Sequence, residues 1–182
     1  MKTAPKLILG ILTMLLMMLV AFGIGAYRGF MEEKLQVDLV LGSLSDVMNT
    51  RIEMANNLLT VAKRHLPQDD ELVLKIRQDI QDLSGESLRQ KAQANERLDY
   101  NSALLLKKLE ALDSVKADSR DYSYVTGYLP RGFEQSAQWA DAGLYNSAAR
   151  KYNNELQGTL NGKAAMLLGV PLAELFEGGQ AP

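Results

Sequence analysis

The sequence predicts an all-α protein in which an N-terminal transmembrane helix precedes an antiparallel helical bundle of about four helices. Three observations predict this fold. An uncharged apolar run extends from Leu7 to Ala26, and helically spaced apolar residues continue through most of the remaining chain. The sequence also contains no convincing alternating strand pattern or hairpin turn signal. Amphipathic helices bury their apolar stripes against one another, so a bundle on a membrane stalk is the expected arrangement.

The composition agrees with one packed domain and an anchor. Of the 182 residues, 47% are hydrophobic and 23% are charged, which suffices for a buried core. The formal net charge is −2 and no basic stripe occurs, so we expect no nucleic-acid partner. The sequence contains no cysteine, which excludes disulfides and cysteine-ligated zinc or iron–sulfur sites.

Residues 7–26 are long enough to cross a bilayer, because twenty residues at about 1.5 Å rise span about 30 Å. A cleaved signal peptide is the alternative, since Lys2 and Lys6 precede the run and Ala21-Phe22-Gly23 has the form of a cleavage site. The run exceeds the roughly 7–15 apolar residues of a signal peptide, so we favour a retained anchor over residues 1–28. The lysines before the span bias the bundle slightly toward the extracytoplasmic side.

The bundle is predicted over residues 29–177, and its first helix extends from Phe30 to Leu66. Apolar residues in this helix recur every three or four positions, which is the stripe of a bundle helix. The stripe consists of Val37, Leu41, Leu44, Met48, Ile52, Ala55, Leu59, Ala62 and Leu66. Pro67 ends the helix because proline removes a backbone donor and clashes with the preceding turn.

The remaining chain is predicted to form further helices separated by turn residues. Asp69 and Asp70 begin a short second helix, and a third helix covers residues 86–116. Residues 122–133 are the least regular part, where Pro130 is expected to break or kink any helix.

A final long helix is predicted over residues 133–168. Pro171 is well placed to start a last short helix with the sequence PLAELFE. Residues 178–182 are expected to form a flexible tail.

The pair Tyr-Asn occurs twice on the predicted last long helix, at Tyr145-Asn146 and Tyr152-Asn153. The two tyrosines fall on one face, with Ala149 between them, so we expect buried rings whose hydroxyls reach a partner at the edge. The asparagines lie about 100° away, at the rim, where an amide is expected to bond to a neighbouring helix and fix its register. A polar groove that recognises a peptide or ligand is the alternative.

The sequence predicts no enzyme, no metal site and no cofactor. His65 is the one histidine and lies near the C-terminal end of the first long helix, where a cation is favoured. A di-iron bundle requires Glu-x-x-His pairs on two helices, and the sequence has none. It also contains no phosphate-binding glycine motif, and a lone histidine gives little support for a serine triad.

Three blocks of the sequence resemble the LemA family. YNSAARKYNNEL looks like the paired Tyr-Asn signature of that family, and GVPLAELFE, residues 169–177, is similar to its terminus with a closing Phe176-Glu177. RIEMANNLLTVAK, residues 51–63, resembles its first-helix pattern. The matching positions in this block are Arg51, Glu53, Asn57, Leu58 and Lys63.

Some positions depart from the family's pattern. Asn56 stands where the family usually has proline, Glu53 replaces its usual aspartate, and VTGYLPRGFEQ stands where it has a continuous Glu-rich helix. The resemblance implies a divergent member: a single-pass protein of the bacterial inner membrane that carries a mostly four-helix bundle. The family's biochemical activity is not settled, so the resemblance implies no catalytic residues. Some members are associated with membrane-organelle formation, which suggests scaffolding.

We therefore expect a membrane-anchored bundle that acts through protein–protein interaction, either with itself or with another membrane protein. The alternative is a ligand-sensing bundle that signals through a partner membrane protein. Tyr122, Tyr124 and Tyr128 motivate it, because these tyrosines lie beside Pro130 and are expected to form the lip of a pocket.

Overall fold

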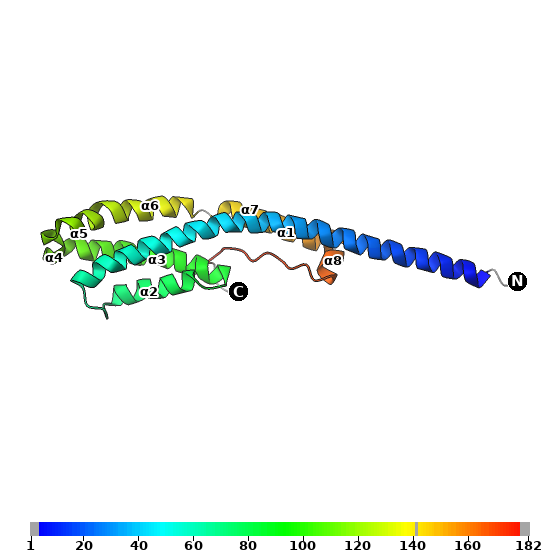
Figure 1. Cartoon of the computed structure of the whole chain (residues 1–182), viewed down its shortest axis with the longest axis horizontal. Coiled ribbons are helices and arrows are strands. Elements are labelled where there is room, and N and C mark those ends of the chain that lie inside the picture. The colour runs from blue at the N-terminus through cyan, green and yellow to red at the C-terminus, as the bar shows by residue number, and fades with distance from the viewer. Residues whose placement is uncertain (1–3, 141, 179–182) are drawn as a thin grey trace. The chain divides into compact units, whose positions relative to one another are not determined.

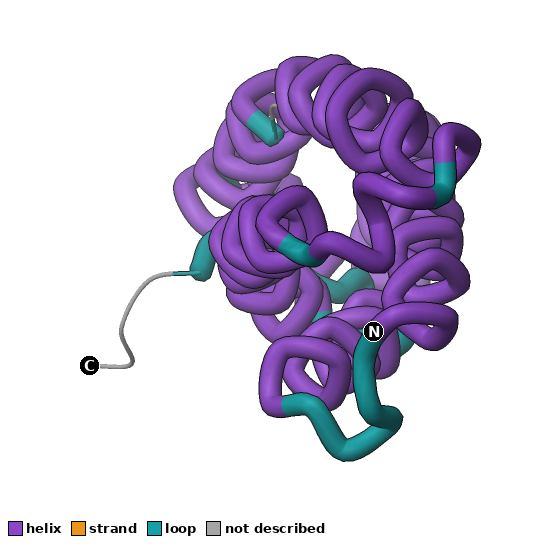
Figure 2. The backbone as a smooth tube through the Cα atoms, turned by 90° about the vertical axis from the view of Figure 1, so that its left-hand side faces the viewer, coloured by secondary structure: helices purple, strands orange, loops and turns teal. Residues whose placement is uncertain are grey.

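A computed structural model describes residues 4–140 and 142–178 of the chain, and these residues are helical for most of their length (Figure 1). Figure 2 shows helices joined by short loops, with no strand in this part of the chain. The predicted all-α fold class is thus confirmed. The elements are α1 (Ala4–His65), α2 (Glu71–Leu83), α3 (Leu88–Ala111), α4 (Asp113–Ala117), α5 (Ser119–Ser123), the π-helix η1 (Tyr124–Tyr128), α6 (Leu129–Trp139), α7 (Gly143–Gly158) and α8 (Leu160–Leu167).

The first helix, α1, continues for 62 residues without a break. Every side chain from Leu7 to Phe22 is exposed, although this stretch is almost entirely apolar. Exposure of so much apolar surface to water is unfavourable by about 25 cal/mol per Å². The helix is long and apolar enough to cross a membrane.

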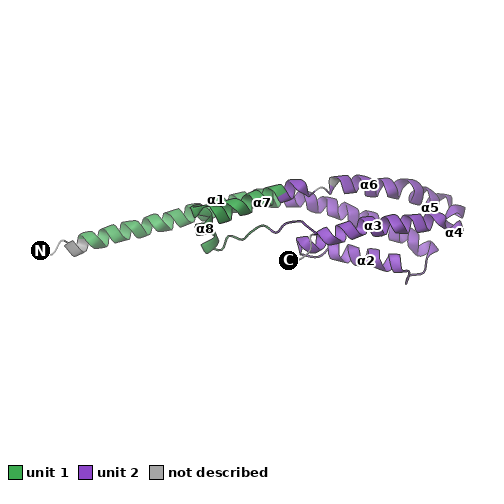
Figure 3. Cartoon of the chain, turned by 180° about the vertical axis from the view of Figure 1, so that it is seen from behind, with its two compact units in different colours: residues 1–40, 147–173 green, residues 41–146, 174–182 purple. Residues whose placement is uncertain are grey.

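The chain divides into two compact units, which Figure 3 distinguishes by colour. The first unit consists of residues 1–40 and 147–173. It contains the first part of α1, most of α7, α8 and the chain that follows α8. Its core includes Phe30, whose ring meets the ring of Tyr152 edge to face at 6.2 Å between centroids. The other buried apolar side chains are those of Ala26, Val37, Ala149, Leu156, Ala165, Val170 and Ala173.

The second unit, residues 41–146 and 174–182, is the larger part of the bundle. In it α3 packs against α2 and α6, and short connections reverse the chain direction between α1 and α2 and between α2 and α3 (Figure 1). Asp70 caps α2 and accepts a hydrogen bond from the backbone of Leu72 at 3.1 Å. The predicted stripe of the first helix is largely confirmed. Leu44, Met48, Ala55, Leu59 and Ala62 are buried in this unit.

The predicted helix over residues 133–168 is wrong, because three helices occupy that range. Thr159 separates α7 from α8 and caps α8 through a hydrogen bond from the backbone of Gly162 at 2.9 Å. A Cβ atom at Gly162 would lie 2.2 Å from the carbonyl oxygen of Leu156. Glycine therefore permits a close approach that no other residue allows at this break.

The expected break at Pro130 takes the form of a change in helix type. Helix α5 passes directly into η1, and η1 passes into α6, in which Pro130 occupies the first turn. Proline removes one N–H from this continuous run, and the run accommodates the loss by the π-helical turn just before it, in which the N–H of Leu129 bonds to the carbonyl of Tyr124 five residues earlier. The predicted third helix also ends early, at Ala111, and α4 follows after one extended residue, Leu112.

The predicted short helix from Pro171 is wrong. Residues 169–178, here called the C-terminal segment, contain no helix. Gly169 has φ +91°, a left-handed conformation that favours glycine and ends α8. The backbone of the segment bonds to side chains of α7, as described below. Residues 179–182 of the predicted tail lie outside the described residues.

Candidate functional site

The first Tyr-Asn pair binds the backbone of the C-terminal segment within the second unit. Tyr145 donates its hydroxyl proton to the carbonyl oxygen of Glu174. The amide of Asn146 donates to the carbonyl of Phe176 at 2.9 Å and accepts from the N–H of the same residue at 2.9 Å. One asparagine thus satisfies both backbone groups of Phe176, whose ring is buried.

The second pair makes the same contacts within the first unit. Tyr152 donates to the carbonyl oxygen of Pro171 at 2.8 Å. Asn153 donates to the carbonyl of Ala173 at 2.9 Å and accepts from its N–H at 2.8 Å. In both pairs the tyrosine binds one residue and the asparagine binds the residue two positions later. We call these four side chains the Tyr–Asn clamp.

The length of helix between the two pairs of the clamp matches the length of three residues of extended chain. Seven helical residues advance about 10.5 Å. Three residues of extended or polyproline chain advance about 9.3–10.2 Å. The residues bound by the asparagines, Ala173 and Phe176, are three apart. Asparagines seven residues apart on the helix can therefore bind residues three apart on the segment.

The clamp decides between the two interpretations of the Tyr-Asn pairs. Both tyrosines are buried, with 3% of their surface exposed, as the sequence predicted. The expected bond from each asparagine to a neighbouring helix is wrong, because the bound element is the uncoiled segment. The alternative, a polar groove that binds a peptide, describes the observed contacts better, since these side chains do bind a peptide backbone. The peptide belongs to the chain itself.

The other residues of the family-like blocks do not form one site. Arg51 is fully buried, and its guanidinium donates to the hydroxyl of Ser136 at 3.3 Å and pairs with Asp99. Leu58 is a core side chain. Glu53 and Lys63 are exposed, whereas Asn57 and Glu177 are half-buried.

A hydrogen-bonded cluster that the sequence did not predict surrounds His65. Its Nδ1 lies 3.1 Å from the hydroxyl of Ser114, and its Nε2 lies 2.9 Å from a carboxylate oxygen of Asp121. Asp121 is 1% exposed and also lies 3.2 Å from Arg64. The connectivity is that of an acid–imidazole–hydroxyl triad. The contacts also account for the burial of Asp121, which requires partners. Helical periodicity in the sequence could not indicate this cluster, because Ser114 and Asp121 lie 49 and 56 residues after His65.

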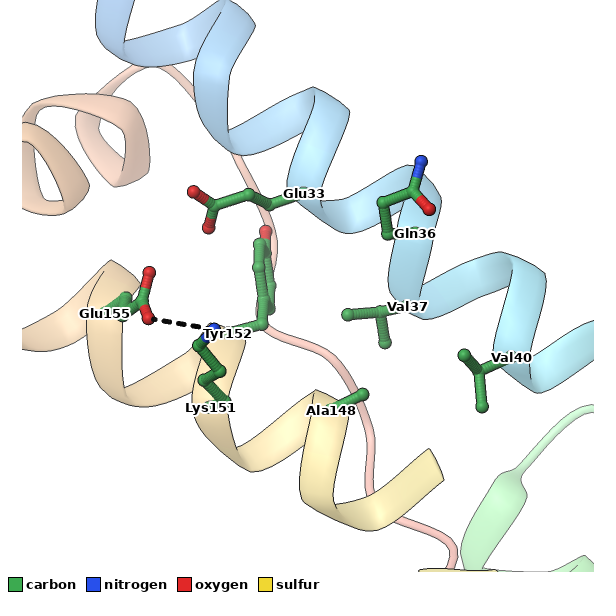
Figure 4. A pocket seen from close by; sticks show the side chains of 8 residues that line it. All are labelled: Glu33, Gln36, Val37, Val40, Ala148, Lys151, Tyr152 and Glu155. Atoms are coloured by element: carbon green, nitrogen blue, oxygen red, sulfur yellow. Dashed lines mark ion pairs between the residues drawn. The ribbon is translucent and has the colours of Figure 1, made fainter. Parts of the chain in front are cut away.

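A cavity of about 380 Å³ lies in the first unit between α1 and α7 (Figure 4). Val37, Val40 and Ala148 provide its apolar part. Its charged part includes Glu33, Lys151 and Glu155, and the Lys151 ammonium lies 3.9 Å from the Glu155 carboxylate.

Burial and the nearby Glu155 carboxylate raise the pKa of Glu33 above its ordinary value of 4.5, although Lys151 opposes the shift. Burial, followed by the charges of Glu33 and Asp38, likewise raises the pKa of the Tyr152 phenol. The cavity is thus partly acidic and partly apolar.

A second cavity, of about 600 Å³, lies within the second unit beside η1. Tyr128 lines it, and the ring of Tyr124 lies 5.2 Å from the Tyr128 ring. The tyrosines of this region are those that the sequence predicted to form the lip of a pocket. In the described part of the chain, no group of three or more histidine, aspartate or glutamate side chains is arranged to hold a metal ion.

Comparison of the chain with protein-family profiles, with characterised proteins and with solved structures found no match.

Proposed function

We propose that this protein is a membrane-anchored helical bundle that acts by protein–protein interaction, as a scaffold or an adaptor. The observation that carries the proposal is α1 itself. Its exposed apolar stretch passes without a break into the helix that lines the cavity of the first unit. A continuous helix shared by the anchor and the first unit sets the distance of the first unit from the bilayer, which suits a scaffold.

The proposal includes family and location. The Tyr-Asn pairs, the Arg51 block and the closing Phe176-Glu177 support a divergent LemA family protein. We place it in the inner membrane of a bacterial cell, with residues 1–28 as a retained anchor and the bundle outside the cytoplasm. A single cysteine at the exposed position Glu134 tests the orientation, because the chain has no native cysteine. A membrane-impermeant maleimide should label it in cells with a permeable outer membrane and an intact inner membrane. Labelling after lysis alone would reverse the orientation.

The cavity of the first unit is the proposed contact surface for the partner. It involves residues 33–40 of α1, which follow the apolar run by about 10–20 Å of helix. A partner protein anchored in the same membrane can contact residues at this distance from the apolar run. The mixture of Val37 and Val40 with charged residues fits an interface, in which an apolar centre is surrounded by polar groups.

A crosslinking experiment tests the contact. A photoreactive residue at Gln36, which lines the cavity, should give one stoichiometric product with itself or a membrane partner in native membranes. The same residue at Leu35, which is exposed on another face of α1 and does not line the cavity, is the control. Lys151→Glu should reduce the Gln36 product, whereas Lys163→Glu on α8 should not. Equal labelling from both positions, or no product, would contradict the proposal.

A second candidate function is ligand sensing through a partner membrane protein. The cavity beside η1 favours it, because the cavity lies where π-helical geometry interrupts a run of α-helix. Such interruptions occur frequently at functional sites.

A further inference from the structure

The cavity beside η1 is lined by small residues that share one face of the run from α5 to α6. These residues are Ser123, Gly127, Gly132 and Ser136, at steps of four, five and four. A step of five returns to the same face in a π-helix but not in an α-helix, so η1 is what aligns them. Thr50 and Met54 of α1 complete the wall. We call this cavity the π-turn hollow.

The two glycines have different roles in the hollow. A Cβ atom at Gly132 would lie 2.7 Å from the sulfur of Met54, so glycine permits close packing at that point. A Cβ atom at Gly127 would meet nothing within 4 Å. Gly127 therefore faces open space, and a side chain introduced there would enter the hollow without displacing the backbone.

Polar side chains without a protein partner surround the hollow. Ser123, Tyr128, Arg131 and Gln135 all line it, and all are exposed. None of the four side chains has a hydrogen bond or ion pair to another described residue. In contrast, the hydroxyl of Thr50 donates to the backbone of Asp46 at 3.1 Å. The four free side chains together offer hydroxyl, amide and guanidinium donors to one space.

The charge of the hollow is positive. Among the described residues that line it, Arg131 carries a charge and none is acidic. Behind the wall, the buried guanidinium of Arg51 donates to the hydroxyl of Ser136, and its Nε atom has no hydrogen-bond partner. The carboxylate of Asp99 that pairs with Arg51 is 45% exposed, so water screens it. A low-dielectric wall with this charge distribution favours an anion.

We propose that the π-turn hollow binds a small organic molecule that carries an oxyanion, either a carboxylate or a phosphate. Arg131 holds the oxyanion through the paired donors of its guanidinium, which fit both groups. Ser123 and Gln135 donate to it, and the apolar part of the ligand rests against Met54 and the ring of Tyr128. The volume of about 600 Å³ lies within the usual range for small-molecule sites. This inference goes beyond the proposed adaptor function and does not depend on it.

Thermal unfolding of the full chain in detergent micelles tests the proposal, because a ligand that binds the native state raises the Tm. The probes are benzoate and phenyl phosphate, with benzyl alcohol and benzylamine as neutral and cationic counterparts. We expect saturable stabilisation by at least one of the two anions and none by the counterparts. A stronger effect of phenyl phosphate assigns the site to phosphates, and a stronger effect of benzoate assigns it to carboxylates.

Variants establish whether the effect comes from the hollow. Arg131→Gln should weaken the anion at least about tenfold, which corresponds to the loss of a charged hydrogen bond. Arg120→Gln, at an exposed arginine of α5 outside the hollow, should leave the affinity unchanged. Gly127→Leu should abolish binding while the ligand-free Tm is retained. Equal stabilisation of wild type and Arg131→Gln, an equal effect of benzyl alcohol, or no stabilisation by either anion would overturn the proposal.

Discussion

The polar face of α7 and the polar face of the run from α5 to α6 use similar side chains in opposite ways. On α7, the phenols and amides of the Tyr–Asn clamp bind backbone groups of the C-terminal segment. Around the π-turn hollow, the side chains of Ser123, Tyr128 and Gln135 have no hydrogen-bond partner among the described residues. Saturated polar groups hold a fold together, whereas unsaturated groups that converge on a cavity are available to a ligand.

The most recognisable motif of the sequence and the open polar cavity therefore lie on different helices. The Tyr-Asn pairs are the most distinctive stretch of the sequence, yet their hydroxyl and amide groups bond to the backbone of the same chain. The irregular stretch around Pro130 is less distinctive, yet its donors are free. Substitutions that separate stability from binding test this division.

The largest expected effect comes from Tyr152→Ala. Loss of a buried aromatic ring costs about 3–5 kcal/mol in the free energy of unfolding. Tyr152→Phe keeps the ring and removes the hydrogen bond to Pro171, so it should cost only about 0.5–1.5 kcal/mol. Denaturant unfolding of the full chain in detergent measures both. Unfolding of Tyr152→Ala at the wild-type midpoint would show that the ring lies at the surface.

Asn153→Ala is expected to cost somewhat less, about 2–4 kcal/mol. The substitution leaves both the N–H and the C=O of Ala173 without their partner, and because both bonds are only partly buried, each unsatisfied group costs about 1–2 kcal/mol. Asn154→Ala is the matched control, because Asn154 is exposed and should change stability by no more than about 0.5 kcal/mol. If the two variants unfold alike, the clamp does not hold the segment.

A smaller loss of stability is expected when Asp70, in the second unit, is protonated at low pH. A hydrogen bond from Lys108 is the main cause that lowers the pKa of Asp70 below its ordinary value of 3.8. A lowered folded-state pKa contributes stability above pH 3.8, and this stability is lost as the pH falls through the lowered value. In Asp70→Asn, the free energy of unfolding should therefore fall less steeply as the pH is lowered below 3.8. Lys108 is partly exposed, so solvent limits the effect. An equally steep fall in Asp70→Asn would contradict the assignment.

The smallest effects on stability are expected at the hollow. Ser123→Ala, Gln135→Ala and Arg131→Gln remove side chains without a protein partner, so each should change the free energy of unfolding by less than about 0.5 kcal/mol. The same denaturant titrations measure this. A loss above 1 kcal/mol for any of them would mean that the hollow is structural, and the contrast with α7 would disappear.

Local pattern was sufficient for the all-α fold class, for the buried face of the first long helix and for the buried tyrosines. Val37, Leu44 and Met48 recur at helical spacing because they face a core, and the spacing is visible without the fold. The C-terminal segment could not be predicted in this way. Pro171 and the apolar residues after it carry a local helix signal, and contacts with asparagines at least twenty residues earlier override it.

The candidate sites depend on tertiary placement in the same manner. The five-residue step from Gly127 to Gly132 looks like a break in an α-helical pattern, and only a π-turn restores the shared face. The partners of His65 come from α4 and α5, so no spacing in the sequence brings them together.

Native-state amide hydrogen exchange on the C-terminal segment tests the clamp most directly. The N–H groups of Ala173 and Phe176 donate to Asn153 and Asn146, so they should exchange much more slowly than those of Leu172 and Leu175. Asn153→Ala should abolish protection at Ala173 and affect Phe176 less, and Asn146→Ala should do the reverse. Uniformly fast exchange across all four amides in the wild-type chain would contradict the account.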